Sequence, residues 1–310
     1  MKDEKIAQVI AEVDTRRLQE TVNYLAKSPL PMRKYNLTLP DHDKSTMQEA
    51  DDYLAAQLES FGYRVRREGM RIQAFRCDTN KPKAHQYSTP DPADPWYEGV
   101  NLLADREGAK RPGDVIVLLA HKDSQSWVHS PGAYDNAVGT AAVLEIARII
   151  ARQEPRRTIR FLFCNEEHTP WTSVLAANNM RQRGDNLVAI FNLDSLGGKS
   201  QADIDAGIKT NVTLYTKDEG KPLADLMTQV NEWYELGLRQ TVVKRDRPGD
   251  DDGSFINAGF AKAVVSVGSY PYADAEYHLE GDVPERVDFE NVKLATQASL
   301  AAVLHTDVAE

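Results

Sequence analysis

Apolar residues first repeat with helical spacing in two segments near the start of the chain, 14–27 and 45–61. The second segment has Ser45 and Gln48 at the spacing of a capping box, and Gly62 follows where helices commonly end. Because apolar positions three and four residues apart share one helix face, this spacing predicts an amphipathic helix over each segment.

A polar, proline-containing stretch over 78–98 interrupts this pattern. The residues before it, 63–71, have the composition of a strand. Four prolines within 78–98 lack the N–H group that helices and sheets use. We therefore expect a loop without regular structure there, at the rim of the molecule.

From residue 113 onward, short apolar runs alternate with amphipathic segments. Near-continuous apolar strands separated by helices indicate a parallel sheet that is covered on both faces. The predicted strands are 115–120, 158–164, 187–193, 211–216 and 262–266, and the predicted helices are 137–152, 174–183, 222–236 and 289–304, the last capped by Asp288. With no repeat or composition shift, the sequence predicts one α/β domain over 1–310, with three α/β/α layers and a mixed, mostly parallel central sheet.

The composition excludes several classes of protein. The 310 residues are 41% hydrophobic and 27% charged, as in ordinary folded proteins, and can bury a core without disulfides. With 37 basic and 47 acidic residues, the formal charge of −10 repels phosphate backbones, so we expect no nucleic-acid partner. Apolar runs such as 115–120 are far shorter than the roughly 20 residues that cross a bilayer, so we expect no membrane span.

Two further features bear on the compartment. Residues 1–5 are mostly charged and lead into a charged amphipathic segment without the apolar stretch of a signal peptide, which favours a cytoplasmic protein. A secreted or periplasmic chain with a trimmed N-terminus would look the same. Cys77 and Cys164 cannot form a disulfide framework, and Cys164, in an apolar run, is expected to be a buried thiol.

Polar residues follow the predicted strands where each strand ends, and this edge of an open α/β sheet is where ligands bind. They are His121-Lys122-Asp123-Ser124, Asn165-Glu166-Glu167-His168, Asp194-Ser195 and, after a tyrosine-rich loop, Tyr277-His278. Asp135 begins the helix after the first of these strands. Imidazole and carboxylate groups without thiolate suit Zn²⁺, or Co²⁺ or Mn²⁺, and the carboxylates outnumber those that one catalytic zinc takes. We therefore expect two metal ions, with Asp135 as the candidate bridge.

Five motifs carry a resemblance to a known family. They are His121-Lys122-Asp123-Ser124, Pro131-Gly132-Ala133-Tyr134-Asp135-Asn136-Ala137-Val138-Gly139, Asn165-Glu166-Glu167, Asn192-Leu193-Asp194 and Tyr277-His278. In this order the chain resembles the co-catalytic zinc aminopeptidases, metallopeptidase family twenty-eight, over most of its length. The resemblance implies the zinc-exopeptidase fold and two Zn²⁺ ions.

The resemblance also implies a role for each matching residue. His121 and Asp194 would bind one zinc, Glu167 and His278 the other, and Asp135 would bridge them. Glu166 would be the general base, Asp123 would orient His121, and Tyr277 would steady the oxyanion. Two cations would activate a water and polarise the carbonyl, while the adjacent, non-ligating glutamate would take the proton and pass it to the leaving amine.

The chain departs from the family pattern in three places. The segment His168 to Ser173 lacks the usual glycine-containing turn, Lys122 replaces a common tyrosine, and Asp250-Asp251-Asp252 replaces a Ser-Asp-His motif. These changes bear on specificity. We expect the aspartate run to be a solvated loop, with attraction of a substrate ammonium as the alternative.

The remaining histidines match no ligand of the family. His168 and His129 lie near the site, and contact with substrate or metal is the minor alternative for each. His42, His85 and His305 are expected to be structural or at the surface.

The sequence thus predicts a metallopeptidase that removes N-terminal residues from peptides or acts on small amides. The alternatives are an amide hydrolase or a glutaminyl cyclase of the same fold, or a binding module that has lost catalysis. The sequence Asp135 to Gly139 argues against the cyclase, and the presence of all five ligands and Glu166 argues against the binding module. No feature of the sequence indicates an oligomeric state.

Overall fold

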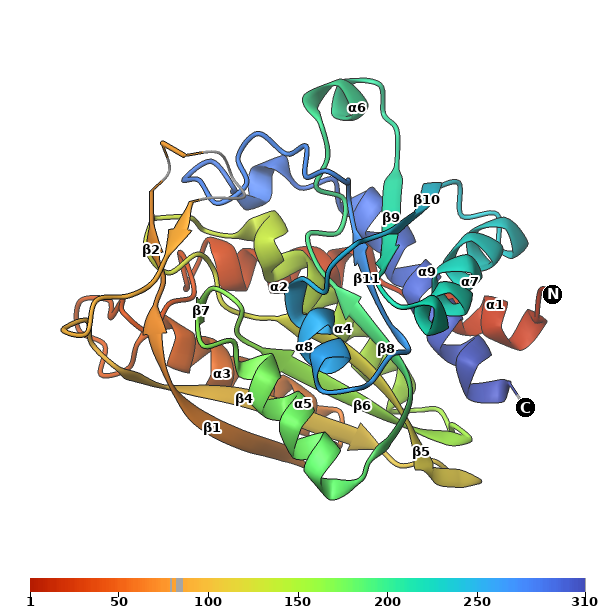
Figure 1. Ribbon diagram of the computed structural model, residues 1–310. Helices are drawn as coiled ribbons and strands as arrows, with labels where there is room; N and C mark the ends of the chain where they lie inside the picture. Colours follow the sequence, from red (N-terminus) through yellow and green to blue (C-terminus); the bar gives the residue numbers. More distant parts are fainter. Residues whose placement is uncertain (79, 82–85, 310) are drawn as a thin grey trace.

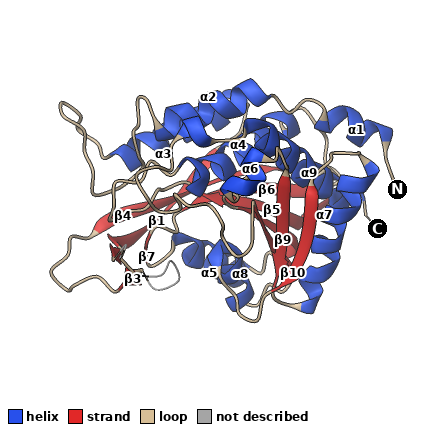
Figure 2. Ribbon diagram, turned by 90° about the horizontal axis from the view of Figure 1, so that it is seen from above, coloured by secondary structure: helices blue, strands red, loops and turns tan. Residues whose placement is uncertain are grey.

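The computed structural model describes residues 1–78, 80–81 and 86–309. Within these residues the chain forms a nine-stranded mixed sheet between helical layers (Figures 1 and 2). In spatial order the strands are β10 (Arg239–Lys244), β9 (Thr210–Tyr215), β11 (Ala263–Val267), β8 (Asn186–Leu193), β5 (Arg111–His121), β6 (Arg157–Cys164), β4 (Tyr97–Arg106), β1 (Val65–Ala74) and β7 (His168–Thr169). The central strands β11, β8, β5 and β6 are parallel, whereas β4, β1 and β7 pair antiparallel at one side.

Helices cover both faces of the sheet. One face carries α2 (Thr15–Ala26), α3 (Thr46–Ser60), α4 (Val138–Ile150) and α9 (Phe289–Val308), and the other carries α5 (Thr172–Arg183) and α8 (Asp250–Asn257) (Figure 2). The other helices are α1 (Glu4–Ile10), α6 (Gln201–Asp205) and α7 (Lys221–Trp233). The three-layer α/β fold predicted from the sequence is confirmed.

The alternation of side chains along β5 explains why both faces need cover. Ile116 and Leu118 belong to the core that is shared with α2, α3, α4 and α9, whereas Val117 and Leu119 belong to a second core with Met180 of α5. All five side chains are completely buried. Successive residues of a strand point to opposite faces, so a continuous apolar run requires a helical layer on each side.

Most of the predicted elements are confirmed to within a few residues. The segments 14–27 and 45–61 form α2 and α3, and Ser45 and Gln48 make the expected reciprocal capping box. The segment 63–71 forms most of β1, and the alternating runs from residue 113 form the expected strands β5, β6, β8, β9 and β11 and helices α4, α5, α7 and α9. The Asp288 side chain caps α9 by accepting a hydrogen bond from the backbone N–H of Asn291.

The expectation of a structureless loop over 78–98 is wrong for part of that segment. Tyr87–Ser88 form the short strand β3, which pairs with β2 (Arg76–Cys77), and Tyr97 already begins β4. Proline is excluded only at the positions that must donate to a ladder, so short strands fit between the prolines. Part of the predicted loop, residues 79 and 82–85, lies outside the described residues.

Several elements were not predicted. The Asp250 to Asp252 run forms the first turn of α8, where carboxylates are favourable near the helix N-terminus, and not a solvated loop. The edge strand β10 has a half-polar pattern that weakens the apolar signal, and α1 and α6 are only 7 and 5 residues long. Among the described residues, none of the helices is both apolar and long enough to span a membrane.

Candidate metal centre

The carboxyl ends of three parallel strands meet at one edge of the sheet. In the ladder between β5 and β6, His121 lies opposite Cys164, so the residues that follow β6 come beside those that follow β5. On its other side β5 pairs with β8, which ends at Leu193, directly before Asp194. The order of the strands therefore brings together three motifs that are far apart in the sequence.

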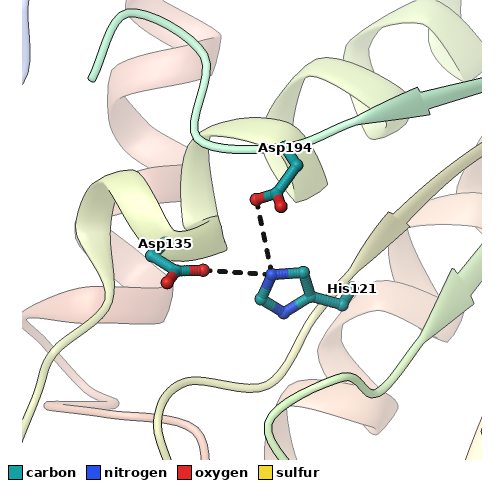
Figure 3. Close-up of side chains that lie close together, drawn as sticks. All are labelled: His121, Asp135 and Asp194. Atoms are coloured by element: carbon teal, nitrogen blue, oxygen red, sulfur yellow. Dashed lines mark ion pairs between the residues drawn. The ribbon is translucent and has the colours of Figure 1, made fainter. Parts of the chain in front are cut away.

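The five predicted ligands lie together and are buried. In one group, ligand atoms of His121, Asp135 and Asp194 all lie within 4.8 Å of one another. In a second group the same holds for Asp135, Glu167 and His278. Figure 3 shows the first group, with the carboxylates of Asp135 and Asp194 directed at the imidazole of His121.

Asp135 belongs to both groups and joins them. Its Oδ1 atom lies 3.1 Å from Nε2 of His121, and its Oδ2 atom lies 2.9 Å from Nε2 of His278. Each of the other two carboxylates faces one histidine: Asp194 Oδ1 is 3.5 Å from His121 Nε2, and Glu167 Oε1 is 3.3 Å from His278 Nε2. The arrangement has two halves with one shared carboxylate.

The carboxylate of Asp123 organises the first half from behind. It lies 3.2 Å from Nδ1 of His121 and accepts the backbone N–H groups of Glu166 and Glu167, at 3.0 and 2.9 Å. A fourth contact, 2.7 Å long, comes from Nδ1 of His168. Burial alone would raise the pKa of Asp123. The hydrogen bonds from His121 and His168 outweigh burial and hold this pKa well below its usual range. The residue therefore orients His121 and fixes the backbone that carries both glutamates.

Two residues that the sequence analysis did not single out hold the turn that carries Asp135. The carboxylate of Asp282 accepts the backbone N–H groups of Tyr134 and Asp135, at 2.8 and 3.0 Å. The completely buried guanidinium of Arg33 donates to four backbone carbonyls, among them those of Lys122 and Gly132. Neither Arg33 nor Asp282 belongs to one of the five motifs or directly follows a predicted strand, so nothing in the sequence distinguished them.

Glu166 stands beside the two groups without belonging to either. It is partly exposed, and its buried Oε2 atom has no hydrogen-bond partner among the described residues. Burial raises the pKa of Glu166 well above its usual value, and the negative charges of Asp251 and Asp250 raise it further. A raised pKa is common among carboxyl groups that transfer protons in active sites.

Three tyrosines surround the carboxylates. The ring of Tyr277 stacks on that of His278, with centroids 3.7 Å apart, and on that of Tyr272. The Tyr272 hydroxyl donates to Asp194 Oδ2 at 3.2 Å, and the Tyr87 hydroxyl donates to Glu167 Oε2. Nothing in the sequence marks Tyr87, which lies in the proline-containing stretch, or distinguishes Tyr272 from the other residues of the tyrosine-rich loop.

The departures from the family pattern have structural roles. Lys122 points away from the two groups and donates to Asn165 Oδ1 at 2.8 Å. His168 is completely buried. It contacts Asp123 and belongs to neither of the two groups. Asp251 and Asp252 are also completely buried, and Arg245 pairs with Asp252 at 2.6 Å, so the expectation of solvated aspartates is wrong.

The remaining single-residue predictions concern His42, His85, His129, His305 and Cys164. His42 is exposed beside Glu49, His305 contacts Tyr234, and His129 lies exposed on the loop after β5. His85 lies outside the described residues. Cys164 is a buried free thiol, as predicted.

The residues of the two groups fit a pair of divalent cations. Three buried carboxylates face one another across two imidazoles, and burial of carboxylates is costly without positive charge. The buried Asp135 Oδ2 atom lies 2.9 Å from Nε2 of His278 without meeting hydrogen-bond geometry, so both atoms are available to a cation. Imidazole and carboxylate donors are those that zinc takes in hydrolytic sites.

Comparisons with known proteins agree with this arrangement. The sequence profile of Peptidase family M28 matches residues 101–303, about two thirds of the chain. The chain belongs to peptidase family M28. The metallopeptidase family indicated by the five motifs is thereby confirmed.

The curated proteins that the chain resembles are distant from it in sequence. A "Probable zinc metalloprotease" of Pyrenophora tritici-repentis is 26% identical over 250 residues, which cover 65% of this chain and 51% of that protein. A "Leucine aminopeptidase 1" of Phaeosphaeria nodorum is 24% identical over 228 residues, 70% of this chain and 57% of that protein. The chain thus spans about half the length of the curated relatives it matches.

Solved structures share the fold of this chain. The aminopeptidase from Aneurinibacillus sp. strain AM-1 superposes with a TM-score of 0.71 over 96% of this chain and 95% of that one, at 14% identity. At this identity the similarity concerns the fold alone.

Proposed function

We propose that this chain is a zinc-dependent aminopeptidase that binds two divalent cations and hydrolyses the first peptide bond of peptides. The observation that carries the proposal is the position of Asp135, whose two carboxylate oxygens lie 3.1 and 2.9 Å from the Nε2 atoms of two different histidines. A carboxylate placed in this way can bridge ions about 3.5–4 Å apart, the usual spacing in two-metal hydrolytic sites.

The residues of each half would hold one ion. His121 and Asp194 would bind one, Glu167 and His278 the other, and Asp135 both. Zinc is supported by the donor types and by the names of the curated relatives. When bound, such ions lower the pKa of a water and polarise a carbonyl oxygen.

Glu166 would act as the general base. Its neighbour Glu167 faces His278, whereas the Oε2 atom of Glu166 has no hydrogen-bond partner within the described residues and is available to a water. The raised pKa favours a group that takes a proton from the attacking water and then gives it to the leaving amine. Asp123 would position this base, since it accepts the Glu166 N–H. Tyr277, stacked on His278, would donate to the oxyanion.

A free α-amine is the expected substrate feature. This expectation rests on the aminopeptidase names among the similar proteins, because two bound cations would neutralise the three carboxylates of the two groups. Comparison of a peptide with its N-acetylated form tests this point: we expect turnover of the free peptide only. Equal turnover of both would exclude an aminopeptidase and indicate a general amidase.

The adjacent glutamates provide the central test. Glu166→Gln should keep both metals and lose about 10²–10⁴-fold in kcat, because the amide preserves size but cannot accept the proton. Glu167→Gln should instead reduce the metal content, because it removes a ligand. Kinetics and elemental analysis are measured on the same preparation of each variant.

The outcomes separate the roles of the pair. Near wild-type kcat of Glu166→Gln at full metal content would remove Glu166 from the mechanism. A stoichiometry of one ion per wild-type chain under saturating zinc would contradict the bridged centre.

A further inference from the structure

The two outer carboxylates of the metal centre share a feature that the roles of the five ligands do not explain. Each has one oxygen directed at a histidine of its own half and the other oxygen hydrogen-bonded to a tyrosine hydroxyl. For Asp194, Oδ1 faces His121 and Oδ2 accepts from Tyr272 at 3.2 Å. For Glu167, Oε1 faces His278 and Oε2 accepts from Tyr87.

Tyr87 comes from a part of the chain that is remote from the motifs. It lies on β3, which pairs with β2, and its ring packs against Phe75 with centroids 4.7 Å apart. The rings of Tyr87 and His278 are arranged edge to face, with centroids 5.2 Å apart. The Tyr87 hydroxyl lies 3.2 Å from His278 Nε2. The hairpin thus holds the phenol against both outer ligands of the second half of the centre.

Tyr87 lies before the part of the chain that the M28 profile matches. The M28 profile begins at residue 101, so Tyr87 lies outside the matched region, whereas Tyr272 lies inside it. The β2–β3 hairpin therefore adds a contact that the five motifs do not include.

We propose that Tyr87 is a positioning residue for the second metal half-site, holding Glu167 so that it offers a cation one oxygen, Oε1, and not two. This inference rests on the proposed two-metal function. A carboxylate with one oxygen engaged in a hydrogen bond leaves the second free as a single ligand, and hydrogen-bonding partners of this kind orient ligands in metal sites. Ligation by one oxygen keeps the number of ligands low, as zinc prefers, and preserves an open position for substrate.

The experiment compares Tyr87→Phe with the wild-type protein by titration of each metal-free protein with Co²⁺ and with Zn²⁺. Phenylalanine keeps the packing with Phe75 and removes only the hydroxyl. Co²⁺ absorbs more strongly in tetrahedral than in higher coordination, so its visible spectrum reports the number of ligands without any measurement of turnover. We expect a weaker Co²⁺ band for one of the two ions and a Zn²⁺ affinity at one site lowered about tenfold or more.

Two control variants accompany it. Tyr63→Phe removes another buried tyrosine hydroxyl, one that donates to the Ala147 carbonyl at 2.8 Å, away from the centre. It should leave both spectra and affinities unchanged. Tyr272→Phe removes the hydroxyl on Asp194 and should alter the other ion of the pair.

The possible results divide clearly. If Tyr87→Phe leaves either the Co²⁺ spectrum unchanged or both Zn²⁺ affinities within twofold of wild type, the role of Tyr87 is wrong, although the two-metal proposal stands. If the wild-type protein itself does not bind two ions, the proposed function fails first, and with it this inference. A change in Tyr63→Phe equal to that in Tyr87→Phe would also overturn the inference, because it would show a general structural effect.

Discussion

The Nζ atom of Lys122 lies 2.8 Å from Oδ1 of Asp51, and both side chains are almost completely buried. Lys122 stands between His121 and Asp123 in the sequence but points away from the metal centre. It also donates to Asn165, the residue before Glu166, so one ammonium group ties α3 to the loops after β5 and β6. The lysine that replaces a common tyrosine of the family is therefore part of the scaffold behind the site.

Replacement of this lysine should destabilise the protein. Lys122→Met leaves the Asp51 carboxylate buried without its cation, and removal of one partner of a buried pair costs about 3–5 kcal/mol. Urea unfolding measures the loss. The double variant Lys122→Met/Asp51→Leu should recover much of it, because no charge then remains unpaired. If the single variant loses less than about 1 kcal/mol, the pair does not stabilise this part of the fold.

Asp123→Asn should weaken metal binding without removing a ligand. The Asp123 carboxylate accepts from His121, His168 and the backbone of both glutamates. An amide offers one acceptor oxygen and turns N–H groups toward the remaining donors. Loss of a partner that orients a ligand typically lowers metal affinity about 10–100-fold, which titration with Zn²⁺ measures.

A matched aspartate provides the control for this variant. Asp185→Asn alters a carboxylate that pairs with Arg160 at the opposite end of the sheet. It should leave Zn²⁺ affinity unchanged. Equal weakening in both variants would mean that Asp123 acts through general stability and not through His121.

The sequence predicted the central sheet well because that part of the fold depends on local patterns. The apolar runs of β5, β6 and β8 are buried on both faces, so they stand out against the helices between them. β4 escaped prediction because it begins at Tyr97, close to the prolines of the preceding stretch. The α8 helix escaped because its three aspartates gave no apolar periodicity, although Arg245 neutralises part of their charge.

The residues of the candidate site could likewise be predicted only where they belong to local sequence patterns. His121, Glu167 and Asp194 follow apolar strands, and a sheet of parallel strands brings such residues to one edge. Tyr87 lies on the short strand β3 and Asp282 on a loop, and the paths that bring both to the centre depend on tertiary packing. No periodicity or spacing in the sequence marks residues of that kind.

Removal of metal should lower the melting temperature of the protein. The carboxylates of Asp135, Asp194 and Glu167 repel one another when no cation lies between them. A ligand at 100 times its Kd stabilises the folded state by about 2.7 kcal/mol per site. Calorimetry in chelator, followed by addition of Zn²⁺ in excess, should show a loss and then a recovery of the melting temperature.

Asp135→Ala tests whether one carboxylate serves both ions. The variant should lose most of the rise in melting temperature on addition of Zn²⁺, because each half of the centre loses a ligand. Asp194→Ala, which alters one half only, should keep part of the rise. Equal responses of the two variants would argue against a bridging role for Asp135.

The contribution of Asp252 to the stability of the protein should fall as pH rises from about 4 to 7. Its carboxylate is completely buried beside Arg245, which it shares with Asp250. Burial raises the pKa of Asp252 to about 7, against the attraction of Arg245 and with the added repulsion of Asp250 and Asp251. Between the ordinary pKa of 3.8 and this value, the folded protein holds a proton that the unfolded chain has lost. The contribution of Asp252 to the free energy of unfolding therefore decreases with rising pH in this window, by at most about 1.4 kcal/mol per pH unit for one proton.

The measurement is urea unfolding of metal-free wild-type protein and Asp252→Asn at several pH values, in chelator so that metal release does not contribute. The variant has no carboxyl group to titrate at this position, so its stability relative to the wild type should improve from pH 4 to 7. Asp218→Asn is the control, because the hydrogen bond from Lys244 lowers the pKa of that exposed carboxyl, away from this pH window. A constant difference between wild type and Asp252→Asn across the window would mean that Asp252 is ionised in the folded protein, with Arg245 supplying enough charge for both of its partners.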